Sequence, residues 1–231
     1  MKFKVDVVIP LYNCEKYIKE TLESIEKQTL RPDTVIVVND GSTDKSLEAV
    51  EEYSKNSKLR IKVINKSNGG LSSARNAGIN ASDADWIAFL DSDDVWEPEK
   101  LEKQVSLIDS SEFENIGLVY CNCFVFNDKT PDERKNFGID KRFRGNVFPK
   151  MLKGNKITGS GSSVLIKREC FKQVGMFDEE LSAYEDWDMW IRISERYSVD
   201  FVDKPLVGIR RHKGNMQGDT HRMNKNMRFF F

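Results

Sequence analysis

The chain has 231 residues, of which 39% are hydrophobic and 32% are charged, and its formal net charge is −1. These values are ordinary for a soluble globular protein, and they exclude a global positive field that would recruit nucleic acid. The longest apolar runs are far too short to span a membrane, and the first residues contain no signal-peptide core. The four cysteines form no CxxC pair. We therefore expect a reduced, cytoplasmic protein that is soluble or at most peripheral to the inner face of a membrane.

Strands alternate with helices through the first hundred residues. The expected strands are short runs of apolar residues closed by turn residues, at 5–9, 35–38, 61–64 and 86–90. Helices are expected after residues suited to a helix start, which are Asn13 (before 14–27), Ser42 or Asp44, Gly70 and Pro98. This alternation predicts a parallel, doubly wound sheet with helices on both faces.

The second half is less regular. Its expected strands are 117–126, 163–167, 199–202 and 206–210, and its expected helices are 168–174 and 186–197. Residues 127–146 are polar and charged and predict a loop. Since there is no internal repeat, we expect a single mixed α/β domain over 1–231. Its nucleotide-binding half would cover about residues 1–95 and its acceptor half about residues 96–231.

Polar clusters follow three of the expected strands, at 10–13, 39–42 and 91–94. Ligands of open α/β sheets bind outside the carboxyl ends of the strands, so these clusters predict a site at one edge. Ordinary turn chemistry could explain each cluster alone. It explains the third cluster less well, because Asp91, Asp93 and Asp94 repel one another unless a cation lies among them. Oxygen ligands favour Mg²⁺ or Mn²⁺, which would also neutralise a diphosphate.

The ordered set of motifs resembles the family 2 glycosyltransferases of GT-A fold, of bacterial, non-processive type. The matching segments are 9–13, 38–44, 70–78, 89–94, 185–187 and 211–212. The resemblance implies a Rossmann-like domain with a mostly parallel mixed sheet. It also implies an inverting enzyme that uses Mn²⁺ or Mg²⁺ and a carboxylate base. The expected partners are a nucleotide-diphosphate sugar, chiefly a UDP-sugar, and a glycan or lipid-linked acceptor.

The resemblance also assigns donor-binding residues. They come from the ends of the expected strands and from the start of the third helix, and they are Pro10, Tyr12, Asn13, Asn39, Asp40, Gly70, Arg75, Asp91 and Ser92. Tyr12 would stack on the base and Asp40 would accept from its ring N–H. Asn39 stands where many relatives carry an acid. Arg75 would face the nucleotide from one turn into the helix, or else form a surface ion pair.

The metal and catalytic residues follow from the same resemblance. Asp91 and Asp93 form an Asp-x-Asp motif in which Asp93 holds metal or ribose, and Asp94 is an adjacent ligand. His212 would reach the metal or the diphosphate. Asp186 would be the base that takes the acceptor's proton, and Glu185 would share this catalytic site or hold the acceptor. The plainer alternative is that these two acids only begin a helix.

Two segments keep alternative readings. Residues 158–163 border the acceptor pocket or are a plain Gly/Ser connector, and Trp187 is a candidate sugar platform. The basic tail, which begins near Arg210, predicts either peripheral contact with an anionic membrane or a flap over the bound donor. The loop after strand one has neither the Gly nor the Arg that a nucleotidyltransferase usually carries there, and it lacks the GxGxxG of a hydride-transferring Rossmann enzyme. A sugar-nucleotide binding protein without transfer activity, or a nucleotidyltransferase, stays open as an alternative.

Overall fold

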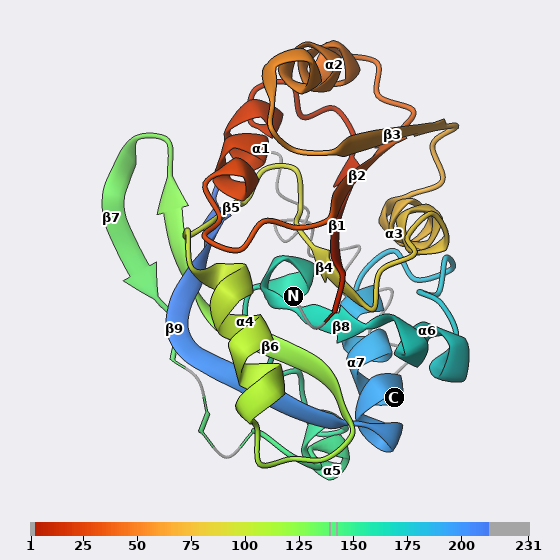
Figure 1. Ribbon diagram of the computed structural model, residues 1–231, viewed down its shortest axis with the longest axis vertical. Coiled ribbons are helices and arrows are strands. Elements are labelled where there is room, and N and C mark those ends of the chain that lie inside the picture. The colour runs from red at the N-terminus through yellow and green to blue at the C-terminus, as the bar shows by residue number, and fades with distance from the viewer. Residues whose placement is uncertain (1–2, 139, 142, 213–231) are drawn as a thin grey trace.

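One curled sheet joins the strands that the structure describes. The structure is a computed structural model, and it describes residues 3–138, 140–141 and 143–212 (Figure 1). The strands lie in the order β3-β2-β1-β4-β8-β6-β9-β5, and β7 pairs with β6. Their bounds are β1 (Val5–Leu11), β2 (Thr34–Asp40), β3 (Ile61–Lys66), β4 (Trp86–Phe89), β5 (Val95–Trp96), β6 (Ile116–Asn127), β7 (Thr130–Asn136), β8 (Leu165–Lys167) and β9 (Ser198–Arg210).

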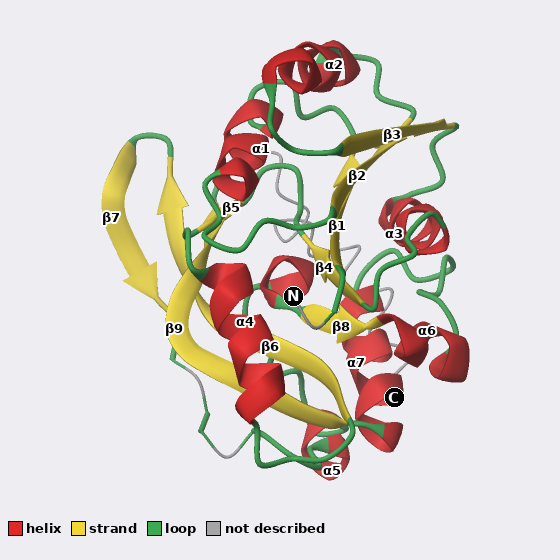
Figure 2. Cartoon of the chain, in the orientation of Figure 1, coloured by secondary structure: helices red, strands yellow, loops and turns green. Residues whose placement is uncertain are grey.

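The first four strands in chain order are parallel, as the sequence predicts. Every residue of β1 is buried, because helices cover both faces of the sheet (Figure 2). One apolar core receives side chains from α1 (Ile18–Glu26), α2 (Ser46–Asn56) and α4 (Lys100–Ser110). The other receives them from α3 (Leu71–Asn80), α6 (Arg168–Val174) and α7 (Glu185–Arg196).

Beyond β4 the sheet becomes mixed, because β8 is antiparallel to both β4 and β6. β9 then runs parallel to β6 and ends beside the loop that follows β4. The predicted break of this strand between 202 and 206 is wrong. Cys121 pairs with Val202 and Asn122 with Pro205, so a bulge absorbs the intervening residues and the strand continues.

The segment 127–146 was expected to be a loop, and this expectation is wrong in part. Its first residues turn back as β7, which pairs antiparallel with the end of β6. Asn127 closes the turn, because its Oδ1 accepts hydrogen bonds from the amides of Lys129 at 2.9 Å and Thr130 at 3.0 Å. The hydrophobic pattern of the sequence does not indicate β7, because its side chains are mostly polar. A paired strand outside the core needs few apolar residues.

The first helix starts later than the sequence predicts. Asn13 is not its N-cap, because α1 begins at Ile18 and Asn13 has a φ of 46°. The Oδ1 atom of Asn13 instead accepts a hydrogen bond from the amide of Thr43 at 2.8 Å. Asparagine tolerates left-handed backbone angles, so it is as well suited to a loop as to a helix N-cap. Here its side chain joins two loops.

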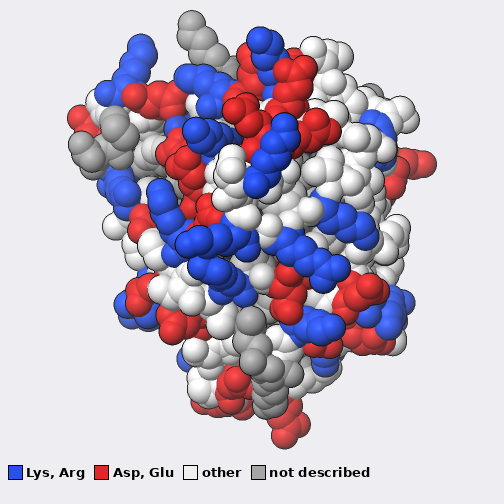
Figure 3. Space-filling model, turned by 45° about the horizontal axis from the view of Figure 1, so that its top comes forward, with Lys and Arg blue, Asp and Glu red and all other residues white. Residues whose placement is uncertain are grey.

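None of the helices in the described part of the chain has the length and apolarity to span a bilayer. Figure 3 shows basic and acidic side chains interspersed over one face, in keeping with the net charge of −1. The tail at 213–231, on which the membrane and flap predictions rest, lies outside the described residues.

α3 lies very close to β1, and Gly78 makes this approach possible. A Cβ atom at Gly78 would lie 2.3 Å from Cγ1 of Val8, which is buried in the centre of the sheet. Because α3 also carries Arg75 and begins beside Gly70, this contact fixes the helix that supplies two candidate site residues.

We expect Gly78→Ala to destabilise the fold by about 1–3 kcal/mol, since the added methyl group forces α3 away from β1. Urea unfolding measures the change. Gly138→Ala is the matched control, because a Cβ there meets nothing within 4 Å. Equal unfolding midpoints for the two variants would contradict the close packing of α3 on β1.

Candidate functional site

The loops that follow β1 and β2 are tied together at the carboxyl edge of the sheet. The amide of Asn13 donates to Oγ of Ser42 at 3.1 Å, and its side chain accepts from Thr43. Tyr12, which follows β1 next to Pro10-Leu11, is 53% exposed. The ring of Tyr12 is therefore available to a ligand, whereas Asn13 holds the two loops in register.

Asp40 anchors the turn that opens α3. Its Oδ1 accepts from the amide of Gly69 at 2.9 Å and its Oδ2 from the amide of Gly70 at 2.8 Å. The Nζ of Lys66 lies 2.6 Å from Oδ1. Asn39 has a similar place, because it donates to Oδ1 of Asn65 at 3.0 Å. The side chains of Asn39 and Asp40 are both buried, and their hydrogen bonds hold the loops at the carboxyl ends of β2 and β3 without a ligand.

A fully buried guanidinium lies at the centre of the site. Arg75 contacts Oδ1 of Asp91 through Nη2 at 2.9 Å and Oε1 of Glu185 through Nη1 at 3.0 Å. Burial opposes its charge, but the carboxylates of Asp91, Glu185 and Asp186 outweigh burial and raise the pKa of Arg75 above its usual value. Arg75 is therefore not a surface ion pair, and its guanidinium bridges the end of β4 and the start of α7.

Space for this guanidinium comes from the 3₁₀ turn η1 (Ser160–Ser163), within the segment where the sequence left two readings open. A Cβ at Gly161 would lie 2.7 Å from Nη2 of Arg75. The next residue, Ser162, accepts from the amide of Asp91 at 3.1 Å and donates to Oδ2 of Asp94 at 2.6 Å. The segment is thus more than a connector, because Ser162 holds the acidic loop through its hydrogen bonds with Asp91 and Asp94.

The three acids after β4 have different surroundings. Asp94 is buried, and its Oδ1 also accepts from the amide of Arg210 at 3.1 Å. Burial, followed by the charges of Asp93 and Asp91, raises the pKa of Asp94 well above its usual value. Asp93 is less enclosed, and its Oδ2 lies 2.9 Å from Nε2 of His212. Burial and Asp91 raise the pKa of Asp93, while His212 lowers it.

The backbone of Ser92 holds this loop in place. Its carbonyl oxygen accepts from Oγ1 of Thr21 at 2.9 Å and from Sγ of Cys14 at 3.3 Å. Arg210 adds a contact that the sequence did not reveal, since its Nε donates to the carbonyl of Asp93 at 2.9 Å. The sequence signal for this contact was weak, because Arg210 stands at the start of a basic tail among other Lys and Arg residues. In the fold it is buried and places His212 beside Asp93.

These residues allow a test of the metal prediction. No point in the described part of the chain is surrounded by three or more His, Cys, Asp or Glu side chains that could hold a metal. Mg²⁺ and Mn²⁺ commonly need only one or two protein groups when substrate phosphates complete the shell. Asp93 and His212 fit that pattern. Asp94 is more deeply buried, and each of its oxygens accepts one hydrogen bond, from Ser162 and from the amide of Arg210, so its place in the metal shell stays a prediction.

Asp186 lies in the first turn of α7, after Tyr184 with its φ of 64°. The amide of Trp187 donates to its Oδ1 at 2.7 Å. Burial and the neighbouring Glu185 raise the pKa of Asp186 to about 6, while Arg75 opposes the rise. The raised pKa makes the carboxylate of Asp186 more basic than that of an exposed aspartate, which suits a group that accepts a proton. Trp187 is half-buried, and its Nε1 donates to the carbonyl of Met151 at 2.9 Å.

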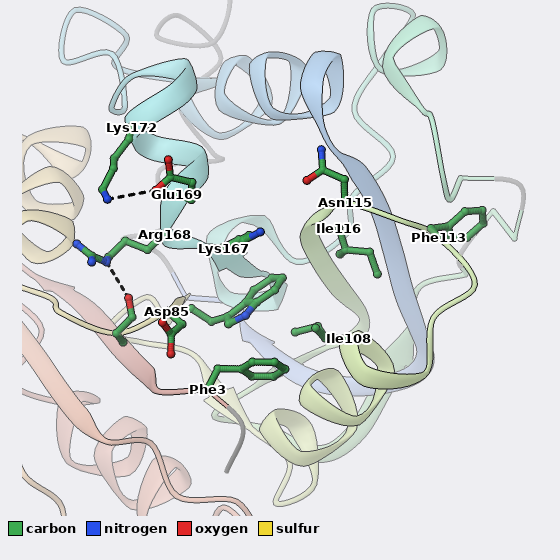
Figure 4. A pocket seen from close by; sticks show the side chains of 12 residues that line it. Phe3, Asp85, Ile108, Phe113, Asn115, Ile116, Lys167, Arg168, Glu169 and Lys172 are labelled. Carbon is green, nitrogen blue, oxygen red and sulfur yellow. Dashed lines mark hydrogen bonds and ion pairs between the residues drawn. The ribbon is translucent and has the colours of Figure 1, made fainter.

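A cavity of about 640 Å³ lies elsewhere, at the amino ends of β1 and β4 (Figure 4). Phe3, Trp86 and Phe113 line it together with basic residues of α6. Its acids are engaged, since Glu169 pairs with Lys172 at 3.1 Å and Asp85 accepts from the amide of Lys4 at 2.8 Å. Because none of the sequence-predicted site residues lines it, we place the candidate site at the opposite edge.

Comparison with known proteins gives consistent results. The family described as Glycosyl transferase family 2 matches residues 6–175. An uncharacterized glycosyltransferase of Rickettsia typhi is 31% identical over 215 residues, which cover 90% of this chain and 64% of the relative. One of Methanocaldococcus jannaschii is 32% identical over 89% of this chain and 70% of its own. The chain thus spans about two thirds of the length of these relatives.

Solved structures share the fold. S. aureus TarS 1–349 in complex with UDP superposes with a TM-score of 0.74 at 25% identity, over 98% of this chain and 64% of that chain. A mannosyltransferase of Pyrobaculum calidifontis in complex with GDP-Man and Mn²⁺ has a TM-score of 0.72 at 19% identity, over 97% and 62%. These neighbours confirm the expected α/β architecture of GT-A type.

The buried bridge generates a prediction about stability. We expect Arg75→Met to destabilise the fold by about 3 kcal/mol or more, because it leaves Asp91 and Glu185 without their shared cation. Arg134→Met is the control, since Arg134 is exposed and pairs with Glu97 at the surface. The control should change stability by less than about 1 kcal/mol in the same urea titration. Similar losses in both variants would contradict a central role for Arg75.

Proposed function

Because the chain belongs to glycosyl transferase family 2, we propose that it transfers a sugar from a nucleotide-diphosphate donor to an acceptor hydroxyl, with inversion at the anomeric carbon. The observation that carries the proposal is the Arg75 bridge. It joins the acidic loop after β4 to the helix start that carries Asp186. A donor-side acid pair and an acceptor-side base are thereby held in one framework.

The donor would lie on the edge formed by the loops after β1, β2 and β4. Tyr12 offers an exposed ring for a nucleobase, and Pro10 precedes it at the end of β1. The amides that open α3 beside Gly70 would face the ribose or phosphates. UDP is the proposed nucleotide, because the structural neighbour at 25% identity is a complex with UDP. Asp40 would accept from the ring N–H of the base through Oδ2, which already accepts one hydrogen bond from the amide of Gly70.

Asp93 and His212 would hold Mn²⁺ or Mg²⁺, which supplies positive charge to the diphosphate as it leaves. The elevated pKa of Asp93 supports this role, since a carboxylate in that position gains from an added cation. Asp91 stays paired with Arg75 and fixes the start of the loop. His212 is oriented by stacking against Tyr17, with ring centroids 4.9 Å apart.

Asp186 would remove the proton from the acceptor hydroxyl. The oxygen then forms a bond to the anomeric carbon from the face opposite the diphosphate. The bond between that carbon and the phosphate oxygen breaks, and its electron pair leaves with the nucleotide diphosphate. Glu185 would act through Arg75 rather than at the substrate, because its Oε1 is held 3.0 Å from the guanidinium. The acceptor is proposed to be a glycan or a lipid-linked glycan precursor.

The base assignment predicts that Asp186→Asn lowers transfer by about a hundredfold or more, because the amide cannot accept the proton. UDP affinity should stay within about twofold, which separates this result from a general loss of the site. Asp188→Asn is the control in the same helix turn, since Asp188 pairs with Arg192. Transfer near the wild-type rate in Asp186→Asn would exclude Asp186 as the base.

A pH profile tests the same residue independently. Asp186 works in its ionised form, and burial raises its pKa to about 6. Below that pH the carboxyl is protonated and inactive, so the rate at saturating donor and Mn²⁺ should rise through about pH 6 and then level off. Asp188→Asn should keep the same inflection. A flat profile between about pH 5 and 8 would contradict the assignment.

The metal assignment predicts that Asp93→Ala and His212→Ala each weaken Mn²⁺-dependent UDP binding by at least about tenfold. Calorimetry with Mn²⁺ and then with EDTA measures the difference. Asp83→Ala is the control, because Asp83 is exposed between α3 and β4. Equal UDP affinity with and without metal would remove the metal from the proposal. Tight donor binding with no transfer to any acceptor would favour a binding protein instead.

A further inference from the structure

A long basic stretch lies on the acceptor side of the molecule. Residues 141–168 contain eight Lys or Arg and no Asp or Glu. Some of these cations have acidic partners from other segments, since Lys141 pairs with Asp203 at 3.1 Å and Arg144 with Asp200 at 3.0 Å. Three further lysines, Lys150, Lys153 and Lys156, lie in or just after α5 (Phe148–Met151).

α5 and the residues that follow it form an amphipathic surface. Met151 is buried in the core, whereas the next residue, Leu152, is 53% exposed. Lys150, Lys153 and Lys156, which stand within four residues of Leu152 in the sequence, are also exposed. Within the described residues, Lys153 and Lys156 have no ion pair. An exposed leucine beside exposed lysines, with no carboxylate in residues 141–168, combines an apolar side chain with positive charge on one short segment.

This surface is held firmly beside the proposed catalytic helix. α5 packs against α7, and Nε1 of Trp187 donates to the carbonyl of Met151 at 2.9 Å. Asp186 is the residue before Trp187. Downstream, the chain leads through residues 154–158 into η1, where Ser162 supports the acidic loop. A partner bound at Leu152 and its lysines would therefore lie next to the acceptor side of the site.

We propose that Leu152, Lys153 and Lys156 dock this face on an anionic lipid surface, with Lys150 at the margin. Lysines near anionic headgroups are attracted by the surface potential, and an apolar side chain between them gains burial in the headgroup region. A soluble polyanion would use the lysines but leave Leu152 in water, so lipid fits the whole surface better. Docking here would bring α7 to a membrane-borne acceptor. The inference goes beyond sugar transfer and is tested without it.

Vesicle flotation of the full chain, without donor or metal, tests the proposal. The chain should bind phosphatidylcholine vesicles that contain phosphatidylglycerol, and it should leave them at high salt because the attraction is screened. Lys153→Glu with Lys156→Glu should lower the partition coefficient by at least about tenfold. Leu152→Ser should lower it severalfold at unchanged charge. Thermal unfolding of each variant checks that these exposed changes leave the fold intact.

Lys27→Glu with Lys55→Glu is the matched control, with the same change in charge. Both lysines are exposed, on the α1 and α2 side, and Figure 1 shows these helices at the opposite end from α5. The control should bind within about twofold of the wild type. Equal losses in both double variants would overturn the proposal in favour of general charge attraction. Wild-type binding by Lys153→Glu with Lys156→Glu would overturn it too, and would direct attention to the tail. Binding of dextran sulfate that Leu152→Ser leaves unchanged, without vesicle binding, would identify a soluble polyanion instead.

Discussion

A guanidinium without access to water must keep its carboxylate partners, and this constraint organises the whole site. Arg75 can stay charged inside the protein only while Asp91 and Glu185 remain beside it. Asp91 begins the acidic loop and Glu185 begins α7, so one residue of α3 fixes elements that are 16 and 110 positions away in the sequence. Gly78 keeps α3 against β1, and Gly161 leaves room for the guanidinium. The proposed donor and acceptor sides are thus joined by one buried polar network, and neither can move without cost to the other.

The same network gives the acids different surroundings. Ser162 and the amide of Arg210 use both oxygens of Asp94, so that this buried acid serves the framework. Asp93 lies against His212 and keeps the surroundings in which a cation would be favourable. Asp186 lies beyond Glu185 with its pKa raised to about 6 by burial. Neighbouring carboxylates with different surroundings can take different roles, and the sequence spacing alone does not reveal which acid takes which.

The sequence predicted much of the fold, because apolar periodicity and turn residues are local signals. The parallel strands and the helix 168–174 were found in this way. Local signals failed where a distant partner decides the structure. β7 depends on its pairing with β6, and the side chain of Asn13 serves Thr43 instead of a helix end. In the site, the 91–94 motif predicted which acids lie there, but it did not predict which residues form hydrogen bonds or ion pairs with them. The contacts of Arg210 and Ser162 with the acidic loop could not be recognised, because each depends on the approach of segments far apart in sequence.

The central claim is that the nucleotide sugar binds at the carboxyl edge of β1, β2 and β4, within the framework that Arg75 holds. A crystal structure of the full chain with UDP and Mn²⁺ would test it most directly. We expect the metal between Asp93, His212 and the diphosphate, the base against Tyr12, and Arg75 still paired with Asp91 and Glu185. Nucleotide in the cavity at the amino ends of β1 and β4, or a diphosphate in direct contact with Arg75 after loss of its carboxylate partners, would contradict the account.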